Sequence, residues 1–216
     1  MLKLYTYFRS SAAYRVRIAL NLKGLPFESI GVHLLRDGGA QHAPDYAALN
    51  PAQLVPTLVD GTRAMGQSLA ILEYLEETSP APALLPADAP GRTRVRALAQ
   101  TIACEIHPLN NLRVLQYLTH ELHIDEAAKA GWYRHWITLG FTALEAMLAG
   151  SPATGAFCHG DSPGMADCCL IPQIANSRRF GTPLEAFPHI RRIEAACLRL
   201  EAFERARPEA QPDAAG

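Results

Sequence analysis

Two pairs of polar residues, each placed directly before a predicted helix, are the first candidates for chemistry. Ser10-Ser11 separates an alternating run from a helical run, and Gln67-Ser68 opens another helical run. At a helix N-terminus the unpaired backbone N–H groups and the helix dipole stabilise an anion, and a hydroxyl adds a donor. Ser10-Ser11 is therefore a candidate thiolate site, and Gln67-Ser68 a candidate site for an α-carboxylate and amine. The alternative for each pair is that a serine simply caps its helix.

The segment from Asn50 to Leu58 places a proline where a strand should begin. Val55-Pro56 precedes the β-branched and apolar run Thr57-Leu58-Val59, which Asp60-Gly61 closes. A proline in the first strand position loses only one ladder hydrogen bond, so an ordinary strand start is one interpretation. The other is a cis Val55-Pro56 bond. In that case the backbone of Val55 is open to an extended peptide, which could pair with it as an added strand.

Three arginines, Arg9, Arg113 and Arg179, are candidates for carboxylate binding, because the guanidinium fork matches a carboxylate. Arg9 adjoins the candidate anion site, although any single arginine is more often a solvated surface group. The eight histidines show no Ser-His-Asp spacing, and no His/Cys cluster has the spacing of metal ligands. We therefore predict no metal.

Composition limits the function classes. The chain has 216 residues, 49% of them hydrophobic, enough for one large or two small domains. Its net charge of −1 favours neither nucleic acid nor an anionic membrane as a partner. It has no signal peptide pattern and no apolar run of about 18 residues. The five cysteines lack disulfide-framework spacing, which predicts a cytoplasmic protein with reduced thiols, and we expect adjacent Cys168-Cys169 to be buried.

The first part of the chain reads as a small α/β domain over residues 1–82. Residues 2–7 alternate as a strand, 12–23 form a helix that Gly24 and Pro26 end, and 27–35 are extended, which makes a βαβ unit. The remaining elements expected here are a short helix over 45–49, a hairpin from 57–59 and 63–65, and a helix over 69–77.

The second part reads as an all-helical domain over residues 92–206, after a proline-rich linker at 79–91. Its first helix carries an apolar stripe from Val95 to Ile106. Pro108 should kink this helix, which is expected to continue beyond it. Further helices are expected over 126–148 and 166–179, and a last one should carry the apolar positions from Ile190 to Phe203. Residues 207–216 are predicted to be a flexible tail.

Residues 10–20, SSAAYRVRIAL, resemble the Ser-Ser-Cys-x-Trp-Arg-Val-Arg-Ile-Ala-Leu signature of zeta-class glutathione transferases. The resemblance spans about residues 1–206, and the combination of motifs is specific where any single one is weak. This family includes maleylacetoacetate isomerase and the bacterial maleylpyruvate isomerases. The other segments that fit it are Asp37-Gly38-Gly39, Asn50-Pro51, Gln53 to Leu58, Gln67 to Glu77, Pro108 to Leu112 and Met165-Ala166-Asp167.

The resemblance implies a thioredoxin-like N-terminal domain, a helical glutathione-transferase C-terminal domain, a homodimer and glutathione as cofactor. It also implies a cis Pro56, with the backbone of Val55 pairing the tripeptide. The family's glutathione contacts fall here on Ser10, Ser11, Gln41, Val55, Gln67 and Ser68, and, from the helical domain, on His107, Asn111 and Arg113.

The activity implied is cis–trans isomerisation of a maleyl double bond in a dicarboxylate diketo acid. Glutathione thiolate, held by Ser10 and Ser11, would add to the alkene and leave after rotation, while Arg9 and Arg179 anchor the carboxylates with Arg113 as a third candidate. We rank maleylacetoacetate before maleylpyruvate as the substrate. The alternatives from other classes are a transferase that conjugates glutathione to small electrophiles such as α-halo acids, and a non-catalytic glutathione-fold protein.

The chain departs from the family pattern at two positions. Ala12 stands where the signature has cysteine, so glutathione alone must supply the nucleophile. Gly164 stands three residues before Asp167, where glutathione transferases usually place the Ser or Thr of a capping box. Glycine is a tolerable cap without the side-chain bond, so we expect slightly lower stability there and no change in function.

Overall fold

The computed structural model describes residues 1–215 and divides into two compact units. Among the described residues, the first unit combines 1–84 with 198–215, and the second comprises 85–197. This division differs from the predicted domains of 1–82 and 92–206, because the chain returns to the first unit after Cys197.

The first unit is built on a four-stranded sheet in the order β2-β1-β3-β4. Strand β1 (Leu2–Thr6) pairs in parallel with β2 (Phe27–Gly31) and antiparallel with β3 (Thr57–Asp60), which forms a hairpin with β4 (Arg63–Met65). The hairpin predicted around Asp60-Gly61 is confirmed. Strand β2 ends earlier than predicted, because the ring of His33 accepts the N–H groups of Leu35 and Arg36 and turns the chain.

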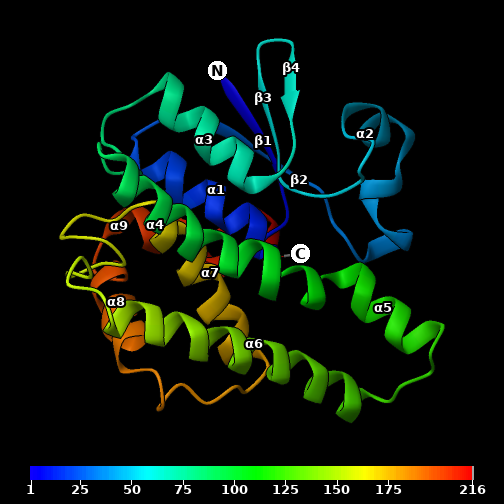
Figure 1. Cartoon of the computed structure of the whole chain (residues 1–216). Helices are drawn as coiled ribbons and strands as arrows, with labels where there is room; N and C mark the ends of the chain where they lie inside the picture. Colours follow the sequence, from blue (N-terminus) through cyan, green and yellow to red (C-terminus); the bar gives the residue numbers. More distant parts are fainter. Residues whose placement is uncertain (216) are drawn as a thin grey trace. The chain divides into compact units, whose positions relative to one another are not determined.

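Three helices flank this sheet: α1 (Ser11–Leu22), α2 (Pro44–Leu49) and α3 (Ser68–Thr78). Helices α1 and α3 pack together on one side of the sheet and α2 lies on the other, as Figure 1 shows. This arrangement is the thioredoxin-like fold that the resemblance implied. The core between sheet and helices is aliphatic and contains Leu4, Val16, Leu58, Ile71 and Leu72.

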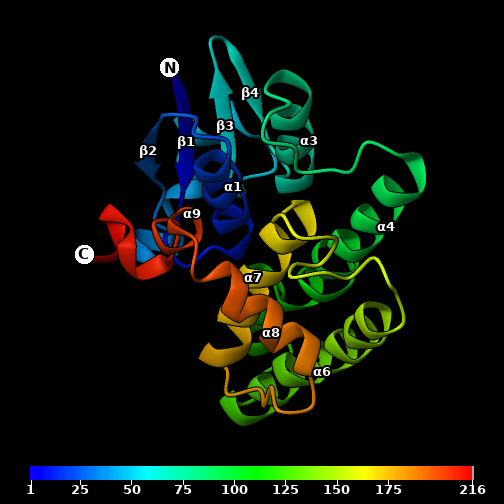
Figure 2. The same cartoon turned by 90° about the vertical axis from the view of Figure 1, so that its left-hand side faces the viewer.

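Helix α1 is buried on every side, since all residues from Ser11 to Leu20 are buried. Helix α3 packs on it, and so does the short helix α9 (Glu201–Glu204) near the C-terminus, which Figure 2 shows beside α1. Two arginines of α1 therefore lie in the interior: Arg15 is 2% exposed and Arg17 is 0% exposed. A buried guanidinium needs acceptors around it, and the surrounding segments supply them.

The second unit is helical, as predicted. It contains α4 (Ala89–Gln100), α5 (Leu112–His120), α6 (Glu126–Ala149), α7 (Met165–Arg179) and α8 (Pro188–Cys197). Helix α7 packs against both α4 and α8. Cys168 and Cys169, both 0% exposed on α7, are core residues as predicted.

The helix that begins with α4 does not continue through Pro108 with a kink, and that prediction is wrong. Residues Thr101–Ile106 form a π-helical turn, in which His107 N–H bonds to the carbonyl of Ile102, five residues back. A 3-10 turn follows at Pro108–Asn110, and α5 then starts anew, with Asn111 Oδ1 accepting the N–H of Arg113 at 3.2 Å. A separate N-cap makes the restart more favourable than a kinked continuation.

Two predictions about the C-terminal part are also wrong. The helix expected from Ile190 to Phe203 ends at Cys197, and α9 begins separately at Glu201. Residues 207–215 are not a flexible tail. They contain 3-10 turns at Pro208–Ala210 and Pro212–Ala215, and the buried Gln211 donates to the carbonyls of Arg205 and Arg207. The remaining residue of that prediction, Gly216, lies outside the described residues.

Candidate active site

The first candidate feature is the start of α1. Ser10 is the N-cap, with Oγ accepting the N–H of Ala13 at 3.2 Å, and its own N–H closes a turn onto the carbonyl of Tyr7 at 2.9 Å. Ser11 is the first helical residue and is 6% exposed. The capping interpretation thus holds for Ser10. It is compatible with an anion site, because the first-turn N–H groups of a helix point toward its N-terminus.

The second feature is the start of α3, where the capping interpretation fails for Ser68. The N-cap is Gln67, whose φ of 66° is strained for a non-glycine residue and whose side chain caps nothing within residues 1–215. Ser68 is the first helical residue, 6% exposed, and its Oγ accepts from Nη1 of Arg15 at 3.1 Å. Strained backbone of this kind concentrates at functional sites. The uncapped first turn suits a carboxylate.

The third feature is the Val55-Pro56 bond, which is cis as predicted. Tyr46 Oη donates to the carbonyl of Leu54 at 2.6 Å and lies 2.9 Å from Oγ1 of Thr57. Nδ2 of Asn50 donates to the same two acceptors at 2.8 and 2.9 Å. Two side chains therefore hold the chain on both sides of Val55.

The backbone of Val55 is well placed to receive an extended peptide. Over the described part of the chain, its N–H and C=O make no hydrogen bond to protein groups. An extended ligand can take both, as a strand added to a sheet does. The first unit thus offers two strand-type hydrogen bonds and two helix N-termini, a combination that fits an anionic peptide such as glutathione.

A hydrophobic cluster brings the turn before α1 and the Val55 segment to one end of the sheet. Tyr7, Val32, Tyr46 and Val55 form it, and Phe8 and Leu34 pack on its edge. The turn leading to Ser10 is therefore packed with the Val55 segment.

Gln41 belongs to the same end of the unit. It is 8% exposed and its Nε2 contacts the carbonyl of Leu34 at 3.4 Å and Nε2 of His42 at 3.0 Å. Gly39 admits this placement, because it has a φ of 99° and an added Cβ would clash with the side-chain amide of Gln41. A side chain at position 39 would therefore displace Gln41.

The remaining candidates are Arg9 in the first unit and His107, Asn111, Arg113 and Arg179 in the second. Arg9 is exposed, with Cζ 4.9 Å from the centroid of the Phe8 ring. In the second unit, His107 ends the π-helical turn and Arg113 is exposed on α5. Asn111 uses its side-chain oxygen as the cap of α5, so a ligand contact would fall to its Nδ2.

Arg179 is the last residue of α7 and is held by aromatic groups. Its Cζ lies 4.9 Å from the Phe180 ring, and that ring stacks on Tyr133 with centroids 3.5 Å apart. Burial raises the pKa of Tyr133, and the charge and hydrogen bond of Arg179 oppose that rise. A cation over an aromatic face keeps its hydrogen-bond fork available to a carboxylate.

Sequence reasoning missed the residues that support the site, namely Arg15, Tyr46 and Thr57, and assigned no role to Asn50. One signal was available for Arg15. Arg15 and Arg17 interrupt an otherwise apolar helical run, and charged residues in such a run are buried only when they are paired.

The capping departure at Gly164 leaves half of the capping box in place. Asp167, 1% exposed, accepts the N–H of Gly164 at 2.8 Å and that of Cys158 at 2.9 Å. Burial raises the pKa of Asp167, and these backbone hydrogen bonds act in the opposite direction.

Among residues 1–215, no group of His, Cys, Asp and Glu is arranged to hold a metal ion. In that same range, no helix has both the length and the apolar character needed to cross a bilayer.

Comparison with known proteins gives the class first: residues 4–83 match the family described as "Glutathione S-transferase, N-terminal domain". A relative from Vibrio cholerae serotype O1, named probable maleylacetoacetate isomerase, is 51% identical over 98% of this chain and 97% of its own length. The chain therefore belongs to the zeta-class glutathione transferases, the family of maleylacetoacetate and maleylpyruvate isomerases. The resemblance seen in the sequence is confirmed.

Two solved structures agree in fold over almost the whole chain. One is a holo structure of maleylpyruvate isomerase, described as a bacterial zeta-class enzyme, with 52% identity and a TM-score of 0.95, covering 98% of this chain and 99% of that one. The other is maleylacetoacetate isomerase from Methylobacterium extorquens AM1 with bound malonate and glutathione, with 43% identity, a TM-score of 0.94 and the same coverage.

Proposed function

We propose that this chain is a glutathione-dependent cis–trans isomerase that converts maleylacetoacetate to fumarylacetoacetate. The observation that carries the proposal is the match, over nearly the full length of both chains, to a relative named for this activity. The first unit is consistent with it, since the open backbone of Val55 and the uncapped start of α3 fit an anionic tripeptide.

Four candidate residues of the first unit, Ser10, Ser11, Val55 and Ser68, have proposed roles in holding the cofactor. Ser68 and the first-turn N–H groups of α3 bind its α-carboxylate, and the backbone of Val55 pairs with its peptide. The N-terminus of α1, with Ser11 and the capping Ser10, stabilises negative charge on sulfur. When bound, glutathione would supply a thiolate nucleophile for reversible addition to the activated double bond, and this chain's part is to hold that sulfur at the start of α1. Ala12 supplies no thiol, and none is needed from the protein.

The substrate is a dicarboxylate, and the arginines Arg9 and Arg179 are its proposed anchors, with Arg113 as a third candidate. Both proposed anchors lie beside aromatic rings that limit their movement, Phe8 for Arg9 and Phe180 for Arg179. Removal of a charged anchor should reduce transition-state stabilisation by about 2–3 kcal/mol. Wild-type kcat/KM for maleyl acids in both Arg9→Ala and Arg179→Ala would refute this assignment.

A second candidate substrate is maleylpyruvate, favoured by the 52% identical solved structure of a maleylpyruvate isomerase. The two substrates differ by a short chain extension, and the proposed arginine anchors tolerate either.

The deciding experiment follows maleylacetoacetate and maleylpyruvate side by side, with and without glutathione. We expect product formation only with glutathione, whose concentration should stay constant. A stoichiometric fall in free glutathione would instead indicate a conjugating transferase. Absence of glutathione binding in calorimetry would indicate a non-catalytic protein.

We propose further that the enzyme is a cytoplasmic homodimer. The support is its family membership, together with five cysteines that are all free thiols in the structure. Light scattering of the purified protein should give twice the chain mass of 23.5 kDa. A monomeric mass would contradict the dimer.

A further inference from the structure

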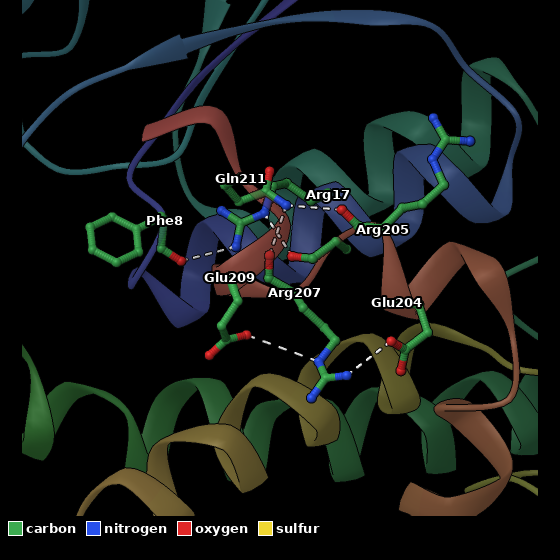
Figure 3. A network of polar contacts seen from close by, with 8 residues as sticks. Phe8, Arg17, Glu204, Arg205, Arg207, Glu209 and Gln211 are labelled. Carbon is green, nitrogen blue, oxygen red and sulfur yellow. Dashed lines mark hydrogen bonds and ion pairs between the residues drawn. The ribbon is translucent and has the colours of Figure 1, made fainter. Parts of the chain in front are cut away.

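The peptide groups of Phe8, directly before the candidate active-site residues, are held by a residue of α1 and by a residue near the C-terminus. The N–H of Phe8 donates to Oδ2 of Asp213 at 2.9 Å, and its carbonyl accepts from Nη2 of Arg17 at 3.2 Å. Figure 3 shows the second of these contacts. Asp213 lies in the last turn that the structure describes, 205 positions from Phe8.

Arg17 extends this hold to the whole turn. Its Nη1 donates to Oγ1 of Thr6 at 2.9 Å and to the carbonyl of Tyr7 at 3.4 Å, and its Nε donates to the carbonyl of Ala206 at 3.0 Å. One buried guanidinium thereby joins the end of β1, the turn after it and the C-terminal segment. Four acceptors compensate the cost of burying this charge.

The C-terminal segment is ordered by its own contacts before it reaches Asp213. Gln211 donates to the carbonyls of Arg205 and Arg207 at 2.9 and 2.8 Å. On the exposed side, Arg207 pairs with Glu204 at 2.9 Å and with Glu209 at 4.0 Å (Figure 3).

Asp213 also acts on Arg17 through its charge. Burial lowers the pKa of Arg17 to about 10, while Tyr14 and the Asp213 carboxylate act to raise it. Asp213 thus contributes both a hydrogen-bond acceptor and a charge opposite to that of Arg17.

The turn held in this way sets the direction of two proposed active-site residues. It runs from Tyr7 to Ser10 and is closed by the bond from Ser10 N–H to the carbonyl of Tyr7. Arg9 lies within it, over the Phe8 ring, and Ser10 caps α1 at its end. A shift of the Phe8 peptide would therefore move the substrate anchor and the thiolate site together.

We propose that Asp213 is a positioning residue for catalysis, and that with Arg17 it makes the C-terminal turn a support for residues 7–11. This inference rests on the proposed function, because it takes Arg9, Ser10 and Ser11 as parts of the active site. Asp213 acts through the Phe8 peptide and need not touch substrate or cofactor.

The test compares Asp213→Ala with Asp213→Asn, which keeps an acceptor for the Phe8 N–H. We expect Asp213→Ala to lower kcat/KM by about tenfold, the effect of one lost hydrogen bond to a charged group. Asp213→Asn should recover most of this loss. Glu209→Ala is the matched control, since it removes a carboxylate from the same segment without a contact to residues 7–11, and it should keep wild-type kinetics.

Rates are normalised to the number of glutathione-binding sites measured by calorimetry, so that unfolded protein does not count as inactive enzyme. Normalised kinetics of Asp213→Ala within about twofold of wild type would overturn the inference. So would an equal loss in Asp213→Asn and Asp213→Ala, because the retained acceptor would then be without effect.

Hydrogen exchange separates this inference from the proposed function. If the wild-type protein shows no isomerase activity, the proposed function fails, yet the amides of residues 7–13 should still exchange faster in Asp213→Ala than in wild type or Glu209→Ala. Equal exchange in all three proteins would overturn the positioning role whatever the activity.

Discussion

Arg15 and Ser68, 53 positions apart in sequence, form a buried hydrogen bond of 3.1 Å from the guanidinium Nη1 to the serine Oγ. The bond joins the second turn of α1 to the first turn of α3, so it links the two helices whose N-termini form the proposed cofactor site. Both residues are nearly inaccessible, at 2% and 6% exposure. An unsatisfied donor would be costly at this position.

Replacing Ser68 should therefore affect both binding and stability. Ser68→Ala removes the acceptor of a buried charged donor, which costs about 1–3 kcal/mol of unfolding free energy. It also removes a proposed ligand of the cofactor carboxylate, so the Kd for glutathione should rise about tenfold. Urea unfolding and calorimetry measure the two effects. Ser68→Thr keeps the hydroxyl and serves as the control. An unchanged Kd in Ser68→Ala would remove Ser68 from the proposed site.

Substitutions of Ser10 should separate capping from catalysis. Ser10→Ala loses the bond to the N–H of Ala13 and should lower stability by about 1 kcal/mol. Ser10→Asp keeps a good cap, so its stability should stay near wild type, but its negative charge opposes a thiolate at the same helix end. We expect Ser10→Asp to be stable and strongly impaired in kcat at neutral pH. Full activity of Ser10→Asp would contradict a thiolate site there.

Tyr46 should contribute to the pH dependence of stability. Burial raises the pKa of Tyr46 above its usual 10.0, while hydrogen bonds with Thr57 and Asn50 act against the rise. Below the unfolded-state pKa the contribution is fully present. As the pH rises through that value, the unfolded chain loses its phenolic proton first, so stability falls until the folded-state pKa is passed.

Tyr46→Phe should accordingly make the loss of unfolding free energy above about pH 9 less steep than in wild type. It should also weaken glutathione binding at neutral pH, because the bond to the Leu54 carbonyl that holds the Val55 segment is lost. Urea titrations across this pH range and calorimetry at pH 7 test both points. Tyr117→Phe, at a tyrosine 58% exposed, is the control for binding. A slope as steep as that of wild type would refute the assignment to Tyr46.

Lys23 and Glu76 form a buried ion pair of 2.9 Å that ties the end of α1 to the end of α3. Lys23 Nζ also donates to the carbonyls of Ser79 and Pro82, and Glu76 accepts the N–H of Leu84. Lys23→Met or Glu76→Gln alone should cost about 3–5 kcal/mol, because each strands a buried charge.

The double variant of this pair should cost clearly less than the sum of the two single variants. Urea unfolding of the four proteins closes a double-mutant cycle. Strict additivity would show that the two charges do not stabilise each other. The surface pair Arg205–Glu201, at 3.8 Å with both side chains largely exposed, provides a matched cycle with little coupling.

Local sequence patterns were sufficient to predict several secondary-structure elements of this protein. The start of α1 at Ser10-Ser11 and the hairpin at Asp60-Gly61 depend on residues within a few positions of each other, so pattern alone predicted them. The cis bond at Pro56 and the family followed from the resemblance, which drew together motifs from about residues 1–206. Local patterns also named Ser10, Ser11, Gln67 and Ser68 as candidate site residues, whereas Gln41 was named from the resemblance alone.

The features that local patterns did not predict depend on contacts between residues far apart in sequence. Residues 207–215 include two prolines and several polar residues, a pattern that predicted a flexible tail. One of the contacts that hold them comes from the N–H of Phe8, which reaches Oδ2 of Asp213 across 205 positions. The hydroxyl of Ser68 likewise has its partner in Arg15, on another helix. The segment around Val55 is held by Tyr46 and Asn50, which both donate to the carbonyl of Leu54. A buried polar group must find acceptors wherever the folded chain provides them, and no local periodicity records which segment does so.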